Sequence, residues 1–230
     1  MAAGLDITTI LFDLDGTLLD TAPDLASALN RLLEEEGREP LAFERVRNQV
    51  SHGSLALVRL GFGSEQRPED FERRRTRLLE IYRSNLYLET APFPGMEALL
   101  AYLERKGLRW GVVTNKPAWL TDPLMDAMRL SARAACVVSG DTTDRRKPDP
   151  MPLLHACDLA GSVATECIYV GDARRDVEAG QAARMGTLVA RYGYIEADEQ
   201  PEDWGADALI DEPREILDWL LDAQNRKVAG

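Results

Sequence analysis

Two aspartates, Asp13 and Asp15, stand one residue apart in the stretch LFDLDGTLLDT, directly after an apolar run. Alternate side chains of an extended strand point the same way, so both carboxylates can address one spot. Two buried carboxylates close together repel each other, so a cation is expected beside them. Gly16 allows a tight turn that brings backbone amides close to an anion. The alternative interpretation is a solvated acidic turn.

A second pair of carboxylates, Asp172 and Asp176, follows another apolar run in CIYVGDARRD. A spacing of four residues keeps the two side chains on one side of a helix start. Two strand ends that each deliver carboxylates supply the oxygen ligands and the negative charge that suit Mg²⁺. The two pairs together therefore predict a Mg²⁺ site.

Candidate donors to an oxyanion follow two further apolar runs. Thr114 and Asn115 end the run in VVTNKP, and Lys147 precedes a proline-marked helix start in DRRKPDP. An ordinary strand-end residue and a solvated loop lysine are the alternatives for Thr114 and Lys147. In chain order the strand ends present an acid pair, a hydroxyl, a lysine and an acid pair. This order suits a phosphate held by donors and a cation around a carboxylate nucleophile.

The segments that must position these residues alternate between two kinds. Short apolar runs rich in β-branched residues are followed by helix-like segments, which is typical of parallel strands joined by crossover helices. The expected strands are ITTILF, LRWGVVT, AACVVS, ECIYVG, TLVA and DALI, and helices are expected to begin near Gly95, Ala118, Pro150, Arg174 and Pro213. The sequence predicts an α/β fold with a Rossmann-like, doubly wound parallel sheet.

One part of the chain breaks this alternation, because residues 21–90 show only helical periodicity. Linker-like composition brackets it, as TAP at its start and TAPFPG at its end. We therefore predict a core of residues 1–20 and 92–230 and an inserted all-helical domain of residues 21–91. The insertion is expected at the carboxyl edge of the sheet, where open α/β folds bind ligands.

Composition excludes several classes of partner. The formal net charge of -12 argues against nucleic acid, which requires a clustered basic surface. The arginines of residues 73–77 recur beside apolar residues at helical spacing and are interpreted as a solvated helix face. No apolar run reaches membrane-spanning length, and the first residues lack the features of a signal peptide. The cytoplasm is the expected location, with Cys136, Cys157 and Cys167 as buried residues in a reducing compartment.

The ordered set FDLDGTLLDT, VVTNKP, KPDP and GDARRD resembles the motifs of the haloacid dehalogenase superfamily of phosphohydrolases. The helical insertion looks like the C1-type cap of that superfamily. Within it, the chain is most similar to bacterial phosphoglycolate phosphatases, particularly the branch that includes N-acetylmuramic acid 6-phosphate phosphatases. That similarity lies in WGVVTNKP, in VSHGS, and in RYGYI followed by WGAD.

The resemblance implies roles for the catalytic residues. Asp13 is expected to attack the phosphoryl group and form an aspartyl-phosphate. Asp15 is expected to protonate the leaving oxygen and then to activate the hydrolytic water. Thr114 would bind the transferring phosphate, and Lys147 would neutralise it and help to keep Asp13 ionised.

The same resemblance implies the ligands of Mg²⁺. Asp13 and Asp172 would bind the ion through their side chains, and Asp15 through its backbone carbonyl. Asp176 would act through water or orient the other ligands.

Substrate selection is expected in the segment VRNQVSHGS of the insertion, with Arg47, Ser51, His52 and Gly53 facing the substrate. An ordinary turn between helices is the alternative.

Three positions depart from the family pattern: Ala173 where serine is frequent, Arg175 where asparagine is frequent, and Arg184 where glycine is frequent. Arg174 and Arg175 are interpreted as solvated helix residues in preference to substrate contacts.

The predicted function is Mg²⁺-dependent hydrolysis of a small phosphate monoester, with 2-phosphoglycolate and N-acetylmuramic acid 6-phosphate as the leading candidates. A sugar phosphomutase of the same superfamily and a non-enzymatic Mg²⁺- and phosphate-binding regulatory module are the alternatives. The enzyme is expected to act as a monomer or homodimer, with no nucleic-acid or membrane partner.

Overall fold

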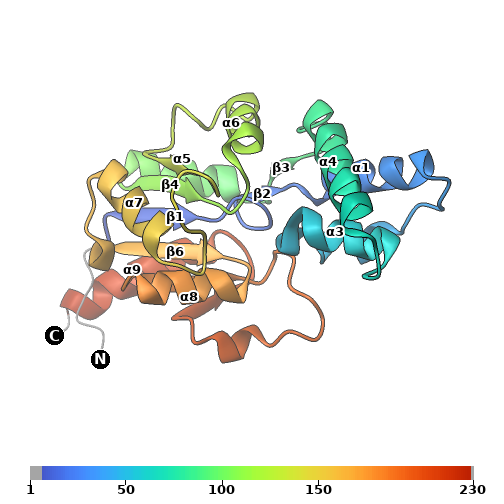
Figure 1. Ribbon diagram of the computed structural model, residues 1–230. Helices are drawn as coiled ribbons and strands as arrows, with labels where there is room; N and C mark the ends of the chain where they lie inside the picture. The colour runs from blue at the N-terminus through green and yellow to red at the C-terminus, as the bar shows by residue number, and fades with distance from the viewer. Residues whose placement is uncertain (1–6, 229–230) are drawn as a thin grey trace.

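A parallel sheet forms the centre of the molecule. In residues 7–228, which this computed structural model describes, six strands pair in the order β5-β4-β1-β6-β7-β8 (Figure 1). Their bounds are β1 Thr9–Phe12, β4 Arg109–Val113, β5 Val137–Val138, β6 Cys167–Gly171, β7 Gly186–Ala190 and β8 Ala208–Ile210. All neighbouring pairs in this sheet are parallel, which confirms the predicted doubly wound sheet.

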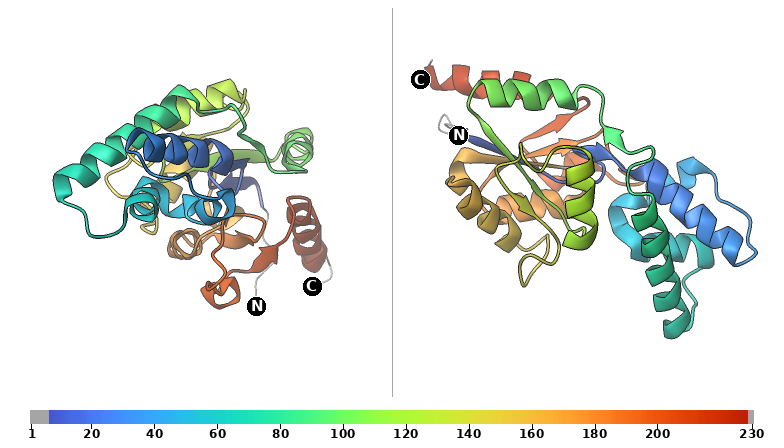
Figure 2. Two further views of the ribbon diagram at one scale, coloured as in Figure 1. Left: turned by 90° about the vertical axis from the view of Figure 1, so that its right-hand side faces the viewer. Right: turned by 90° about the horizontal axis from the view of Figure 1, so that it is seen from above.

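Helices cover both faces of the sheet. They are α5 Met96–Arg105, α6 Ala118–Ala127, α7 Met151–Ala160, α8 Arg174–Ala182 and α9 Glu215–Val228. Helices α5 and α9 lie on one face, and α7 and α8 lie on the other (Figure 2). Side chains of β1 alternate accordingly, since Ile10 and Phe12 join the cluster on the first face and Leu11 joins the cluster on the second.

The sheet order places β1 between β4 and β6. Phe12 is in register with Val112 of β4 and Val170 of β6. The three strands therefore end at the same level, and the residues that follow them emerge at one edge of the sheet.

The inserted segment is helical, as predicted, and lies beyond the carboxyl ends of the strands (Figure 1). Its elements are α1 Ala22–Glu35, α2 Phe43–Arg47, the 3₁₀ turn η1 Val50–His52, α3 Gly53–Phe62 and α4 Pro68–Ser84. Leu25, Leu29, Leu32 and Leu33 form the buried stripe of α1 and pack in a cluster with residues of α3 and α4. The same cluster includes Tyr194 from beyond β7, so it reaches the sheet half of the molecule.

A two-stranded antiparallel ribbon joins the two halves. It pairs β2 Leu19–Asp20 with β3 Ala91–Pro92. The sequence predicts only linkers here, because strands of two residues show no periodicity. We propose that the boundaries between core and insertion fall at this ribbon. Residues 1–6 and 229–230 of the predicted core lie outside the described residues.

The structure also tests the predictions for the cysteines and for the arginines of α4. Cys136, Cys157 and Cys167 are buried free thiols, as predicted. The solvated arginine face of α4 is only partly correct, because Arg74 is 16% exposed and forms an ion pair with Glu36 at 2.8 Å. Over the described residues, every helix is too short or too polar to span a membrane.

The remaining short helices lie between core elements. They are the 3₁₀ turns η2 Ala164–Glu166 and η3 Pro201–Trp204.

Candidate active site

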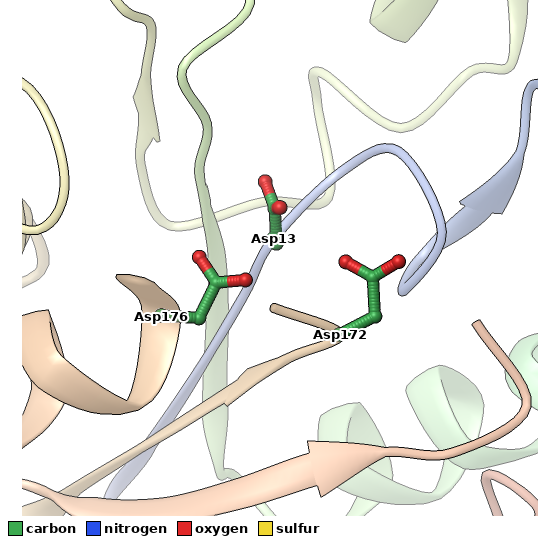
Figure 3. A group of neighbouring side chains, drawn as sticks. All are labelled: Asp13, Asp172 and Asp176. Carbon is green, nitrogen blue, oxygen red and sulfur yellow. The ribbon is translucent and has the colours of Figure 1, made fainter. Parts of the chain in front are cut away.

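The carboxyl ends of β1 and β6 bring three aspartates together (Figure 3). Asp13 follows β1, Asp172 follows β6, and Asp176 lies in the first turn of α8. Each offers a carboxylate oxygen, and these oxygens lie within 4.8 Å of one another. All three residues are buried, so the site cannot be a solvated acidic turn.

Lys147 lies among these acids. Its Nζ is 3.0 Å from Oδ1 of Asp13 and 2.7 Å from Oδ1 of Asp176. It also donates a hydrogen bond to the hydroxyl of Tyr169 at 2.6 Å, and that hydroxyl donates to the carbonyl of Val113 at 2.7 Å. Lys147 is buried, so the alternative of a solvated loop lysine is wrong.

Lys147 and the nearby Arg175 together do not balance three buried carboxylates. Burial, together with the charges of Asp13 and Asp176, raises the pKa of Asp172 to about 7. Burial also raises the pKa of Asp13, although Lys147 acts in the opposite direction. Oδ1 of Asp172 is buried with no hydrogen-bond partner among the residues described. An all-oxygen donor set with excess negative charge and a free acceptor fits a hard cation such as Mg²⁺.

The carboxylate of Asp15 belongs to a different group of contacts. Oδ1 of Asp15 accepts hydrogen bonds from Nζ of Lys116 at 2.9 Å and from the hydroxyl of Thr21 at 2.7 Å. Nζ of Lys116 also donates to the hydroxyl of Tyr82, in α4, at 3.0 Å. Asp15 is thus held from both halves of the molecule, apart from the three-aspartate group.

Lys116 and Tyr82 are site residues that the sequence analysis missed. Lys116 stands directly after Asn115 in VVTNKP, and this position beside a predicted donor was a usable signal. Tyr82 carried no such signal, because its spacing in α4 marks it only as a core residue.

The structure places Thr114 and Asn115 at the end of β4, but their side chains differ in contacts. Thr114 is buried, lines the cavity described below, and accepts a hydrogen bond from the backbone N–H of Lys116 at 3.2 Å. Oδ1 of Asn115 accepts from the backbone N–H of Lys147 at 3.1 Å, and its Nδ2 donates to the carbonyl of Lys147 at 3.0 Å. Asn115 therefore fixes the backbone that carries the lysine.

The predicted selectivity segment reaches the aspartates. The hydroxyl of Ser51 donates a hydrogen bond to Oδ2 of Asp172 at 2.7 Å. Nε2 of His52 lies 2.8 Å from Oε1 of Glu196. Gly53 begins α3 beside them, and Ser51, His52 and Gly53 all line the cavity.

Arg47 has a different position from the rest of that segment. Its guanidinium donates to the carbonyls of Gly193 and Tyr192, each at 3.0 Å, and lies 5.0 Å from the centre of the Tyr194 ring. Arg47 is not among the described residues that line the cavity. Its contacts connect the insertion to the sheet half of the molecule.

A cavity of about 660 Å³ lies between the sheet edge and the helical insertion. Asp13, Asp15 and Thr114 line it from the sheet. Its wall is partly apolar, formed by Leu55, Leu57, Leu79, Trp119 and Leu120. Its cationic side chains are those of Arg75, Lys116, Arg146 and Arg175.

The prediction that Arg175 is a solvated helix residue is wrong. Arg175 lines the cavity and donates a hydrogen bond to the carbonyl of Ser51 at 2.8 Å. Burial opposes the charge of Arg175, but the neighbouring carboxylates, Asp176 most strongly, outweigh that effect and raise its pKa. The neighbouring Arg174 is exposed, as predicted.

The other two departures have local explanations. The backbone N–H of Ala173 donates to Oδ2 of Asp176 at 3.0 Å, and the N–H of Asp176 donates to the carbonyl of Ala173 at 2.9 Å. This start of α8 therefore forms without a hydroxyl at position 173. Arg184 has φ 61°, a left-handed conformation that glycine adopts without strain.

Comparison with known proteins agrees with this geometry. A family model described as haloacid dehalogenase-like hydrolase matches residues 10–190. N-acetylmuramic acid 6-phosphate phosphatase of Pseudomonas aeruginosa is 40% identical over 214 residues, which cover 93% of this chain and 95% of that protein. Phosphoglycolate phosphatase of Xanthomonas campestris pv. campestris is 39% identical over 207 residues, which cover 90% of this chain and 93% of that protein.

Solved structures share the fold. A crystal structure from Haemophilus somnus, described as a predicted phosphoglycolate phosphatase, aligns with a TM-score of 0.83 at 24% identity and covers 93% of this chain and 98% of that chain. A haloacid dehalogenase-like family hydrolase from Streptococcus pneumoniae aligns with a TM-score of 0.79 at 18% identity, again over 93% and 98%. Together with the match over most of the sequence, they confirm the predicted resemblance, and the chain belongs to the haloacid dehalogenase-like hydrolases.

Proposed function

We propose that this protein is a Mg²⁺-dependent phosphatase that hydrolyses a small phosphate monoester through a phosphorylated Asp13. The observation that carries the proposal is the buried group of Asp13, Asp172 and Asp176 with Lys147 beside it. Asp13, Asp172 and Asp176 would hold the ion, which would supply positive charge next to the transferring phosphoryl group. Phosphoryl transfer requires mainly such positioning and charge stabilisation.

Different residues of the chain carry out the separate steps of phosphoryl transfer. The carboxylate of Asp13 attacks phosphorus and displaces the alcohol oxygen, while Thr114 and Lys147 stabilise the phosphoryl oxygens. Asp15 gives a proton to that alcohol oxygen and later takes one from the water that hydrolyses the aspartyl-phosphate. The contacts of Asp15 with Lys116 and Thr21 support this role, because they hold its carboxylate beside the cavity and away from the three-aspartate group.

The cavity favours an acidic leaving group of considerable size. Several cations line it, and the first relatives reported above act, by their names, on esters that carry a carboxylate. A volume of about 660 Å³ lies within the range of about 300–1,000 Å³ that is common for drug-sized ligands. A phosphorylated amino sugar with a lactyl group suits this space and its apolar wall better than the two-carbon 2-phosphoglycolate. We therefore propose N-acetylmuramic acid 6-phosphate ahead of 2-phosphoglycolate.

The helical insertion, residues 21–91, would act as a cap over the reacting groups. Tyr82 and Ser51 contact Lys116 and Asp172 across the cavity, and such contacts exclude water from the phosphoryl group. The cytoplasm remains the proposed location, supported by three buried free thiols that suit a reducing compartment.

Phosphate release tests the proposal. The substrates are N-acetylmuramic acid 6-phosphate, 2-phosphoglycolate and a set of hexose phosphates, each with Mg²⁺ and with a chelator. We expect Mg²⁺-dependent turnover with the highest kcat/KM for the first substrate. Asp13→Asn should lower kcat by about 10⁴ or more, on the scale of loss of a covalent nucleophile. Asp144→Asn, at an exposed loop position, is the matched control and should retain activity.

Two results would contradict the proposal. Substantial turnover by Asp13→Asn would exclude Asp13 as the nucleophile. A higher kcat/KM for 2-phosphoglycolate would keep the phosphatase but reverse the order of the two substrates.

A further inference from the structure

Tyr194 is buried where the two halves of the molecule meet. It follows β7, and its ring lies 6.2 Å from that of Phe93, centre to centre, next to the strand by which the chain returns from the insertion. Arg47 of the insertion lies over the same ring, 5.0 Å from its centre. Tyr194 is 1% exposed, so these contacts enclose it almost completely.

The hydroxyl of Tyr194 caps the first helix of the insertion. It accepts hydrogen bonds from the backbone N–H groups of Thr21 at 2.7 Å and Ala22 at 3.0 Å, and it donates to Oδ1 of Asp20 at 2.7 Å. These three bonds use its donor and both of its acceptor sites.

The side chain of Thr21 points to the active site instead, where its hydroxyl donates to Oδ1 of Asp15. Within the described chain, the helix has no side-chain hydrogen bond from its N-cap residue. The first N–H groups of a helix lack intrahelical partners, so a hydroxyl from another part of the chain takes that place here. Tyr194 thereby fixes both the start of α1 and the residue that holds Asp15.

The backbone of Tyr194 contacts the aspartate group. Its N–H donates to Oδ2 of Asp172 at 2.9 Å, the same oxygen that accepts from Ser51. Gly193 permits this approach, because a Cβ there would lie 2.4 Å from Cβ of Asp172 and 2.4 Å from the carbonyl oxygen of Gly16. The segment is therefore packed directly on the loop that carries the acids.

We infer that Tyr194 is a positioning residue that couples the cation site at Asp172 to the hinge Asp20–Ala22, from which the helical insertion begins. The inference rests on the Mg²⁺ site of the proposed function and adds a regulation of that site. A shift of the Asp172 carboxylate moves the backbone of Tyr194, which is hydrogen-bonded to it. The phenol ring moves with this backbone and changes its hydrogen bonds to the amides of Thr21 and Ala22. Conversely, movement of the insertion changes the hydrogen bonds at Asp172.

Backbone amide hydrogen exchange of the full chain, with and without Mg²⁺ and with no substrate, tests this coupling. In the wild-type protein we expect Mg²⁺ to slow exchange at Thr21 and Ala22. Tyr194→Phe keeps the ring and removes the hydroxyl, so exchange at these two amides should be about tenfold faster without Mg²⁺. Mg²⁺ should no longer slow it, while exchange in β1 stays unchanged.

Tyr192→Phe is the matched control. Tyr192 packs on the same Phe93 at 4.9 Å between ring centres, but its hydroxyl donates to the carbonyl of Thr17. This variant should retain the Mg²⁺ effect at Thr21 and Ala22. If Tyr194→Phe does not fold, Asp20→Ala removes the acceptor of the Tyr194 hydroxyl and should speed exchange at Thr21 by about threefold. Ala22 is not a readout for this variant, because its N–H also donates to Oδ1 of Asp20 at 3.4 Å.

The outcomes separate the two proposals. If Mg²⁺ slows exchange around Asp172 but acts equally on Thr21 and Ala22 in wild type and Tyr194→Phe, the coupling is wrong and the cation site stands. If Mg²⁺ has no effect around Asp172 in the wild-type protein, the cation site is wrong and the coupling with it.

Discussion

Nζ of Lys116 lies 2.9 Å from Oδ1 of Asp15, and this ion pair is largely enclosed between the sheet and α4. The proposed acid and base of the reaction is therefore not a free side chain at a strand end. Lys116 sets its direction, and the hydroxyl of Tyr82 sets the direction of Lys116. Burial opposes the charge of Lys116, but Asp15 and Tyr82 reverse that effect and raise its pKa.

Lys116→Met should lower kcat by about 10²-fold, because Thr21 is then the one side-chain partner left to Asp15 within residues 7–228, and Asp15 loses its orientation. KM should change less than kcat. Steady-state phosphate release measures both, and a thermal melt confirms that the variant folds. Lys106→Met, at an exposed lysine over the Tyr102 ring, is the control. Equal kcat values for the two variants would contradict the positioning of Asp15 by Lys116.

The stability of the metal-free protein should fall as the pH rises from about 5 to about 7. The pKa of Asp172 is raised from 3.8 to about 7, so in this window the native state holds a proton that the unfolded chain has lost. Mg²⁺ replaces that proton, so its stabilising effect should grow with pH. Melting temperatures in chelator and in Mg²⁺ test both trends.

Asp172→Asn is the comparison for that experiment, since it removes the titrating group and keeps the shape. It should flatten the metal-free pH profile and reduce the effect of Mg²⁺. A wild-type melting temperature that rises with pH across the window, in parallel with the variant, would show that Asp172 ionises normally.

Arg75→Gln should raise KM for a carboxylate-bearing substrate by about tenfold, the scale of a lost charge-assisted hydrogen bond. Arg75 lines the cavity, where its guanidinium bonds Ser54 and Glu72. A hexose phosphate without a carboxylate should show no comparable increase. Arg77→Gln changes an arginine of the same helix that pairs with Glu35 outside the cavity lining, and should leave both KM values unchanged. A similar loss for both substrates would argue against carboxylate recognition.

Arg184→Gly should increase the free energy of unfolding by about 0.5–1 kcal/mol, because glycine adopts the left-handed conformation at this helix end without strain. Arg184 is exposed, so few contacts are lost. Urea denaturation measures the gain, and phosphate release should be unchanged. A destabilised variant would show that the arginine side chain contributes more than its backbone strain costs.

The sequence was sufficient for the parts of the fold with strong periodicity. Apolar residues repeat at the period of a strand or a helix in the central sheet, in the helices between its strands and in the helical insertion. Such a repeat is visible in the local sequence without knowledge of tertiary contacts. The ribbon of β2 and β3 was missed, because two-residue strands depend on a pairing partner more than seventy residues away in the chain.

The aspartates and Lys147 were predictable because parallel strands bring their carboxyl ends to one edge. Arg175 was misjudged, since helical spacing does not reveal that the insertion covers that side of α8. Lys116 and Tyr82 depend on the same packing of one half on the other. The apolar periodicity within each half does not predict which residues of the two halves contact each other. Those contacts become visible only in the tertiary structure.

The ribbon also bears on how such a protein can be rebuilt. Asp20 and Ala91 face each other in the antiparallel pair, so the chain leaves the sheet half and returns to it at adjacent points. A short turn joining them would convert the ribbon into a hairpin and leave every strand of the sheet in register. A replacement for the insertion would still have to supply its contacts to the site, which are Thr21 on Asp15, Tyr82 on Lys116 and Ser51 on Asp172. The ribbon thus brings the two ends of the insertion together, but a change of substrate range through the insertion also acts on the residues that carry out the phosphate chemistry.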